Sequence, residues 1–297
     1  MNTNIATIKN NTTFNFEENP VEEMTLTTLK RTHKENDIYG NPIKGIYHFQ
    51  LIDQIAEICH NHNLNYEVES IFAAQNKNKT MPGVVVLPLV EQTHGEKAIE
   101  AHIVRRVFTT IQIKDGENEE LTTNLAIAYH QDGIQVAIGP CVKICHNQCI
   151  LSAERLISTY GKDKVPMEEL FNIIDLWLRD FRTDMHFDRE RIEKMKARIL
   201  APDEILKMIG LLQVTRVAHD SKDKSISTKV KAYPLNQGQI SVFTEDLLKL
   251  QQKQSQITIW DMYNIATNLY KPGRTDIPVI LTQNATMADM MAEYWGV

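Results

Sequence analysis

The sequence predicts an α+β protein in which a mostly antiparallel β-meander is followed by a helical C-terminal half. Two observations support this class: β-branched runs interrupted by Asp-Gly pairs fill residues 82–146, and apolar residues at helical spacing take over after residue 150. The chain has 297 residues, of which 42% are apolar, enough for a sizeable core. We therefore expect a disordered tail at 1–24, an α+β region with the antiparallel sheet at 25–150, and a mainly helical region packing on it at 151–297.

The N-terminal part of the chain predicts one tail and one helix. Residues 1–24 are rich in Asn and Thr and lack apolar periodicity, a composition that does not offset the entropy of ordering. From His48 onward, apolar residues recur at helical spacing up to the polar run at 60–65. An amphipathic helix is therefore expected to open the folded part of the chain.

Four β-branched runs predict the strands of the meander. The last two flank Asp132-Gly133, and Gly supplies the positive φ angle that a tight hairpin turn needs. Along the last run, apolar side chains share one parity, and small or polar side chains share the other. The sheet should thus have one apolar face and one small, polar face. The predicted strands are 84–90, 103–113, 121–129 and 134–144.

The second half of the chain predicts a series of helices. An apolar stripe from Met167 to Phe181 indicates a core-facing helix. Thr258 with Asp261, and Thr286 with Asp289, have the spacing of a capping box, which satisfies free amides at a helix start. Further helices are expected at 186–200, 203–213, 258–270 and 286–295.

Charge and composition limit the classes of partner. The net charge is −6, so the chain as a whole does not attract nucleic acid, and any contact with DNA must be a local patch. The first residues lack a basic segment followed by an apolar core, and the apolar runs are too short for a membrane helix. We expect a cytoplasmic protein with reduced cysteines and no membrane contact.

One cluster of soft ligands could hold a metal. Cys141, Cys145, His146 and Cys149 lie within nine positions, and Cys59, His60 and His62 repeat the theme upstream. Structural zinc usually takes cysteines at C-x2-C spacing, which is three positions apart, and here they are four positions apart. The favoured interpretation is small side chains on a packed sheet face, with no cofactor; a zinc site at these four residues is the alternative.

Basic residues provide the candidate nucleic-acid contacts. Lys222, Lys224, Lys229 and Lys231 lie in a Ser-rich stretch with one acid, so they could contact phosphates. Arg105 shares the parity of apolar neighbours in its strand and needs either an ion-pair partner or an anion. The basic residues between 179 and 198 are diluted by acids and indicate a solvated helix face.

Catalytic motifs are lacking. There is no Walker loop, G-x-G-x-x-G, G-x-S-x-G or H-E-x-x-H sequence. Asp203 could be combined with Asp220-Ser221-Lys222 as a metal-dependent nuclease pattern, but Asp203 better suits the first turn of a helix. His94, His130 and His219 are interpreted as surface histidines. No catalytic residue is therefore predicted.

Three segments resemble a family known only as phage/plasmid-like proteins of unknown function. They are Leu125–Gly133 with its His-Gln-Asp-Gly turn, Gly139–Asn147, and the Trp-bearing segment Thr258–Thr267. The chain departs from the family pattern at His146, where the family has Ser, and at Gln148, where it has Gly. The resemblance implies an intracellular protein encoded on a plasmid, prophage or conjugative element, and it implies no catalytic residues.

Three functions are consistent with these features. The leading hypothesis is a non-enzymatic mobile-element protein that binds nucleic acid, with single-stranded DNA favoured, through basic patches and aromatic platforms. The second is a module that binds a host or element-encoded protein, for example to counteract host defence, without DNA contact. The third is a metal-dependent enzyme that uses the Cys/His cluster. The aromatic platforms considered are Phe108, Tyr129, Tyr233 and Phe243.

Overall fold

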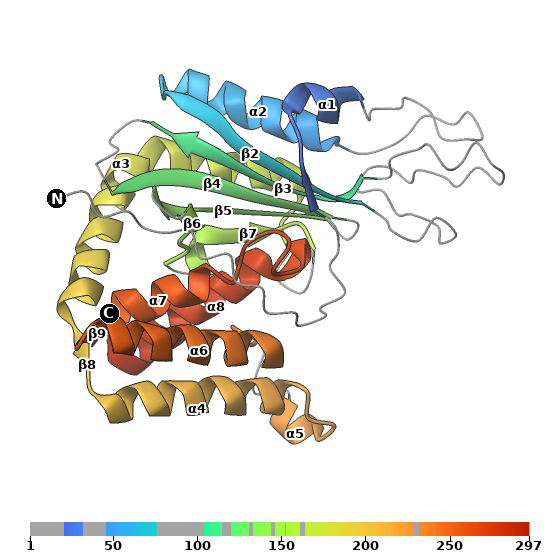
Figure 1. Cartoon of the computed structure of the whole chain (residues 1–297). Coiled ribbons are helices and arrows are strands. Elements are labelled where there is room, and N and C mark those ends of the chain that lie inside the picture. The colour runs from blue at the N-terminus through green and yellow to red at the C-terminus, as the bar shows by residue number, and fades with distance from the viewer. Residues whose placement is uncertain are drawn as a thin grey trace.

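A computed structural model describes residues 21–31, 46–75, 104–114, 120–130, 133–143, 146–151, 153–160, 164–227 and 232–296. It confirms the predicted α+β class. Figure 1 shows a curled antiparallel sheet with helices on both of its faces, and a helical C-terminal half. No helix in these ranges is long and apolar enough to cross a lipid bilayer.

The sheet is a meander in which sequence neighbours are also spatial neighbours. Strands β1 to β5 follow one another in order, all antiparallel, and two short strands, β6 and β7, pair with β5. Three of the predicted strands are confirmed as β3, β4 and β5, whereas 84–90 lies outside the described residues. The strands are β1 Val21–Glu23, β2 Tyr66–Gln75, β3 Val104–Ile113, β4 Leu121–His130, β5 Gly133–Val142, β6 Asn147–Gln148 and β7 Leu156–Ser158.

Helices cover both faces of the sheet. Helices α1, α2 and the first half of α3 lie on one face, α7 and α8 lie on the other, and α6 and α4 form outer layers beyond them (Figure 1). The short strands β8 (Ile199–Leu200) and β9 (Ile257–Thr258) pair beside α4 and α7. The helices are α1 Leu26–Arg31, α2 His48–Asn61, α3 Met167–Ala197, α4 Pro202–His219, α5 Lys224–Ser227, α6 Gln237–Lys253, α7 Ile259–Thr267 and α8 Ile277–Trp295, with a 3₁₀ turn at Ala153–Arg155.

The two faces of the sheet differ as predicted. Leu125, Ile127 and their cross-strand partners Ile138 and Val136 face α2 and α3 in one apolar core. The alternate positions are small or polar, such as Ala126 opposite Ala137, and face α7 and α8 in a second core. Small side chains let a helix approach the sheet closely, and polar ones supply the groups of the site described below.

Strand β2 was not predicted, because a β-bulge breaks its alternation. Val68 pairs with Ile111 and Ser70 with Thr110, so Glu69 is an extra residue in β2. A bulge changes the parity of a strand, and no continuous period of two therefore marks this stretch of sequence. The bulge turns both Glu69 and Ser70 toward the small, polar face.

Two helix predictions are wrong. The predicted helices at 167–181 and 186–200 form one helix, α3, because 182–185 contain neither Gly nor Pro and nothing interrupts the backbone ladder. The helix predicted at 286–295 begins at Ile277, with Pro278 in its first turn. Thr286 is not its cap: its hydroxyl donates to the carbonyl of Thr282 inside α8.

Other boundaries are confirmed or shifted slightly. The helix starting at His48 is α2, and the Thr258–Asp261 capping box opens α7 as predicted. Asp203 and Glu204 lie in the first turn of α4, which runs on to His219. Of the expected tail, 1–20 lies outside the described residues, and Val21–Glu23 forms β1. Helix α6 was not predicted.

Buried hydrogen bonds tie the sheet to the helices. The Tyr263 hydroxyl of α7 donates to Asn284 of α8, and both side chains bond the backbone of Ile150. The Asn284 amide also donates to the carbonyl of Gln148 at 2.6 Å. The segment after β5 is thereby fixed between the sheet and both helices. A second close contact holds it from the sheet side, since a Cβ on Gly139 would lie 2.1 Å from the Cys149 carbonyl oxygen.

We expect Gly139→Ala to destabilise the fold by about 3 kcal/mol, because its Cβ would collide with backbone that two helices hold in place. The measurement is the free energy of unfolding in urea. Gly210→Ala is the matched control: Gly210 lies inside α4 with no atom within 4 Å of the added Cβ, so this variant should be about 0.5–1 kcal/mol more stable. Equal effects at the two sites would contradict the close approach.

Asp188 makes stability depend on pH. Burial in α3 raises its pKa to about 6, against the opposing effect of Arg155, which lies 3.8 Å away. The folded pKa exceeds the unfolded value of 3.8, so the stabilising contribution is complete below pH 3.8 and is lost as the pH rises through 6.

Asp188→Asn should therefore gain stability relative to the unchanged protein as the pH rises from 4 to 7, by on the order of 3 kcal/mol at most. Urea unfolding at several pH values measures this difference. Asp184→Asn, which removes the nearer partner of Arg155 at 3.3 Å, should instead be less stable at pH 7. If the stability difference between Asp188→Asn and the unchanged protein does not change with pH, the pKa of Asp188 is not raised in the folded state.

Candidate functional site

A cavity of about 400 Å³ lies between the small, polar face of the sheet and the C-terminal end of α7. The side chains that line it come from β1, β2, β3, β5 and β6, from the turn before β6, and from the end of α7 and the turn after it. They include two carboxylates, a histidine, a lysine and three aromatic rings. The lining residues are Glu23, Glu69, Ser70, Phe72, Phe108, Thr110, Cys141, His146, Gln148, Thr267, Tyr270, Lys271 and Pro272.

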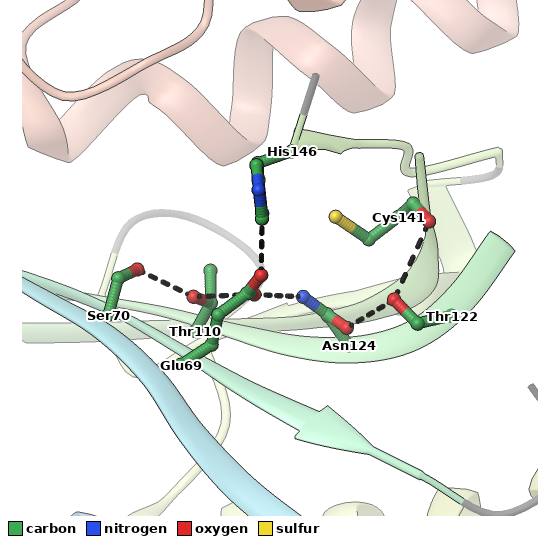
Figure 2. A network of polar contacts seen from close by, with 7 residues as sticks. All are labelled: Glu69, Ser70, Thr110, Thr122, Asn124, Cys141 and His146. Atoms are coloured by element: carbon green, nitrogen blue, oxygen red, sulfur yellow. Dashed lines mark hydrogen bonds and ion pairs between the residues drawn. The ribbon is translucent and has the colours of Figure 1, made fainter. Parts of the chain in front are cut away.

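Glu69 is the centre of the polar network in this cavity (Figure 2). Its carboxylate accepts hydrogen bonds from the Asn124 amide at 2.8 Å and from the Thr110 hydroxyl at 3.3 Å. The Ser70 hydroxyl lies 2.7 Å from that of Thr110, and the Thr122 hydroxyl donates to Asn124 at 3.0 Å. Three strands, β2, β3 and β4, thus fix the position of one carboxylate.

His146 closes one side of the cavity. Its Nδ1 lies 2.7 Å from the second Glu69 oxygen, while 68% of its side chain is exposed. Its φ of +52° is uncommon outside glycine and turns the side chain back over the sheet from the turn before β6. Because this pair is at the surface, the imidazole can leave at little cost and free an acceptor site on Glu69.

The floor of the cavity has spare hydrogen-bond acceptors. A carboxylate has about four acceptor sites, and Glu69 uses three of them. Gln148 donates its amide to the carbonyls of Asn124 and Gly139, and its buried Oε1 has no hydrogen-bond partner in the described ranges. A ligand that brings N–H or O–H donors would satisfy both groups.

Aromatic rings give the cavity flat apolar surfaces. Phe72 and Phe108 are cross-strand partners on β2 and β3, and Tyr270 faces them from the turn after α7. The Tyr270 hydroxyl donates to the carbonyl of Pro234, which fixes the ring. Lys271 lies beside it. The arrangement suits a ligand with a planar ring and donor groups on its edge.

The structure places the upstream and downstream members of the predicted Cys/His cluster on opposite faces of the sheet. Cys141 and His146 line the cavity, Cys149 is buried behind it against α7 and α8, and Cys145 lies outside the described residues. Cys59, His60 and His62 lie at the end of α2, on the opposite face of the sheet. Within the described part of the chain, no three His, Cys, Asp or Glu side chains are grouped to hold a metal ion.

Cys59 and His62, two of the upstream members of the Cys/His cluster, have structural roles. Cys59 is fully buried in the core under α2, and burial raises the pKa of its thiol to about 12. His62 pairs with Asp175 of α3 at 2.9 Å.

Two of the predicted basic residues, Lys222 and Lys224, do not line this cavity. Lys222 and Lys224 are exposed at the far end of α4 and in α5, whereas Lys229, Lys231 and the Arg105 side chain lie outside the described residues. The neighbouring Arg106 forms an ion pair with Asp276, before α8.

Among the proposed aromatic platforms, Phe108 alone lines the cavity. Tyr129 faces the other side of the sheet, and its hydroxyl donates to the carbonyl of Ile46. Phe243 is buried in the core, and Tyr233 lies under the guanidinium of Arg216.

The histidine predictions have mixed outcomes. His130 is not a surface residue: it is 2% exposed and packs edge-on against Tyr160, because the end of β4 is covered. His219 is part-exposed and pairs with Asp220 at the end of α4. His94 lies outside the described residues. Asp203 and Asp220 lie at opposite ends of α4, so the nuclease pattern is not assembled.

Sequence reasoning missed Glu69, Ser70 and Asn124. The bulge conceals the first two in the sequence, and no pattern distinguishes Asn124 from the rest of its strand. The signal that could have found them is the polar parity of the last strands, which predicted a face with room and hydrogen-bonding groups.

In three comparisons, no family model, no curated protein and no solved structure matches the chain.

Glu69→Ala should destabilise the protein by about 1–3 kcal/mol, because the fully buried Asn124 amide loses its acceptor. Glu67→Ala is the matched control on the same strand: its exposed ion pair with Lys114 is worth about 0–1 kcal/mol. Thermal and urea unfolding of both variants measure the difference. Similar losses would show that the Glu69 network contributes nothing beyond a surface ion pair.

Proposed function

We propose that this protein binds single-stranded nucleic acid by taking one unpaired base into the cavity around Glu69. The observation that carries the proposal is the pair of acceptors, Glu69 and Gln148, in a cavity lined by aromatic rings. The binding is non-enzymatic.

The chemistry of an unpaired base matches the cavity. Base edges carry amino and ring N–H donors, which a carboxylate accepts, as in contacts to the cytosine amino group. Base faces stack on aromatic side chains. A cavity of about 400 Å³ falls in the range of small-ligand sites. A paired base has its edge engaged and its faces stacked, so a single strand is favoured over a duplex.

Because the protein as a whole is negatively charged, phosphates can be bound only by local groups of cations. With a net charge of −6, the strand must be held by a few cations, of which Lys271 is nearest to the base. Lys222 and Lys224, which lie away from the cavity, would contact phosphates further along a longer strand. Such a role fits a cytoplasmic protein of a plasmid, prophage or conjugative element, which is the context that the family resemblance implies.

Labelled 20-nucleotide single strands should bind with an affinity that falls as salt rises, measured by fluorescence anisotropy. Nucleoside monophosphates should compete. Glu69→Gln should weaken binding about 10- to 100-fold, because a carboxylate acceptor becomes an amide. Glu67→Gln, outside the cavity on the same strand, should bind as the unchanged protein does.

The outcomes separate the alternatives. Binding of nucleotides but not of strands would replace the proposal with a small-molecule site. If Glu69→Gln and Glu67→Gln bind strands with equal affinity, the cavity is not the binding site. The double variant Lys222→Gln, Lys224→Gln would then show, by a change in the salt dependence of binding, whether these lysines contact the strand. No binding at low salt would overturn the proposal.

A further inference from the structure

The free acceptor capacity of Glu69 is concentrated on one of its two oxygen atoms. Asn124 and Thr110 both donate to Oε2, at 2.8 and 3.3 Å, and so occupy its acceptor sites. His146 Nδ1 lies 2.7 Å from Oε1, and its exposed imidazole can be displaced (Figure 2). When the imidazole leaves, the open sites of the carboxylate are both on Oε1. A ligand that fills them must bring two N–H or O–H groups to the same atom.

The hydroxyl groups that line the cavity already have their hydrogens engaged. A hydroxyl has a single hydrogen, and Thr110 donates its own to Glu69, so Ser70 is the donor in the 2.7 Å contact with Thr110. Thr267 and Tyr270 each donate to a backbone carbonyl. These side chains therefore offer a ligand oxygen lone pairs and no hydrogens.

Gln148 adds a second acceptor to the same cavity. The residue is 9% exposed, and its amide nitrogen donates to the carbonyls of Asn124 and Gly139. Because a carbonyl oxygen only accepts hydrogen bonds, these two contacts fix which end of the amide is nitrogen. The other end, Oε1, is buried and has no partner among the residues that the structure describes. Buried acceptors are normally paired, so the cavity favours a ligand rich in donors.

Guanine alone among the common bases has two adjacent donor groups on its pairing edge. Its N1–H and N2–H bonds are side by side and nearly parallel, so both can converge on one oxygen atom. Adenine and cytosine have one donor group next to a bare ring nitrogen, and thymine and uracil have one N–H between two carbonyls. The Glu69 carboxylate would repel each of these acceptors and would gain one hydrogen bond in place of two.

We propose that the cavity selects guanine, whose N1–H and N2–H groups donate to Oε1 of Glu69 after His146 has moved away. The inference rests on the proposed function, because it requires an unpaired base in the cavity. The guanine ring lies against the aromatic side chains of the lining, and its O6 accepts from Lys271, which has three N–H donors. A two-point contact of this kind discriminates between bases by about 10- to 100-fold.

Labelled oligothymidine strands of equal length, each with one central substitution, test this selection by fluorescence anisotropy. A central guanine should bind about 10- to 100-fold more tightly than a central adenine, cytosine or thymine. Hypoxanthine, which is guanine without the N2 amino group, should lose most of this gain. The matched control is 7-deazaguanine, which keeps the pairing edge and should bind as guanine does. These comparisons use the unchanged protein, so they do not depend on the folding of a variant.

Glu69→Gln tests whether Glu69 makes the selection. Asn124 and Thr110 donate to the Oε2 position and would keep an oxygen there, so the new NH₂ group would take the place of Oε1. The variant should therefore no longer distinguish guanine from hypoxanthine. Glu67→Gln, on the same strand and outside the cavity, should distinguish them as the unchanged protein does.

The outcomes separate this inference from the proposed function. If all strands bind equally and Glu69→Gln weakens them all, a base enters the cavity without selection, and this inference alone is overturned. A guanine preference that hypoxanthine shares, or that Glu69→Gln leaves intact, would overturn it as well. If methylguanidine competes as strongly as guanosine monophosphate, the site takes a guanidinium group and the guanine assignment is wrong. If no strand binds, both proposals fail.

Discussion

The hydrogen bonds of Tyr263 and Asn284 to the backbone at 148–150 are the constraint on which the arrangement depends. They are buried, so each would leave an unsatisfied group if broken, and they join the end of the meander to both α7 and α8. The close approach of Gly139 to the same segment holds it from the other side. The cavity exists because the helices are fixed at this distance from the sheet.

Much of the fold could be predicted because local pattern and final structure agree. Strands β3, β4 and β5, helix α2 and the cap of α7 follow from alternation, helical spacing and a Thr-x-x-Asp sequence. The failures have two causes, one local and one long-range. The continuity of α3 depends on nothing interrupting its backbone ladder, and the end of β4 buries His130 through contacts with a distant tyrosine.

The candidate site was harder to predict than the fold for a physical reason. The polar face of the sheet was predicted from parity, but its central residue, Glu69, lies on a bulge that conceals the strand carrying it. A bulge interrupts the alternation of apolar and polar residues and turns side chains to the other face of the sheet. The same feature that creates the site therefore removes the pattern by which the strand could be predicted. The soft-ligand cluster had the opposite property: it is prominent in sequence, yet the sheet separates its upstream and downstream members.

Helix α3 has a consequence for how the molecule loses its structure. Its first half contributes Leu170, Ile174 and Phe181 to the core on one face of the sheet, and its last turns contribute Ile192 and Met195 to the core on the other. At about 1.5 Å per residue, its 31 residues form a rod of roughly 46 Å. Neither core can unfold without also unfolding part of α3, so the two cores form one cooperative unit. Cutting the chain between the strands and α3 would leave two fragments, each lacking side chains that complete a core.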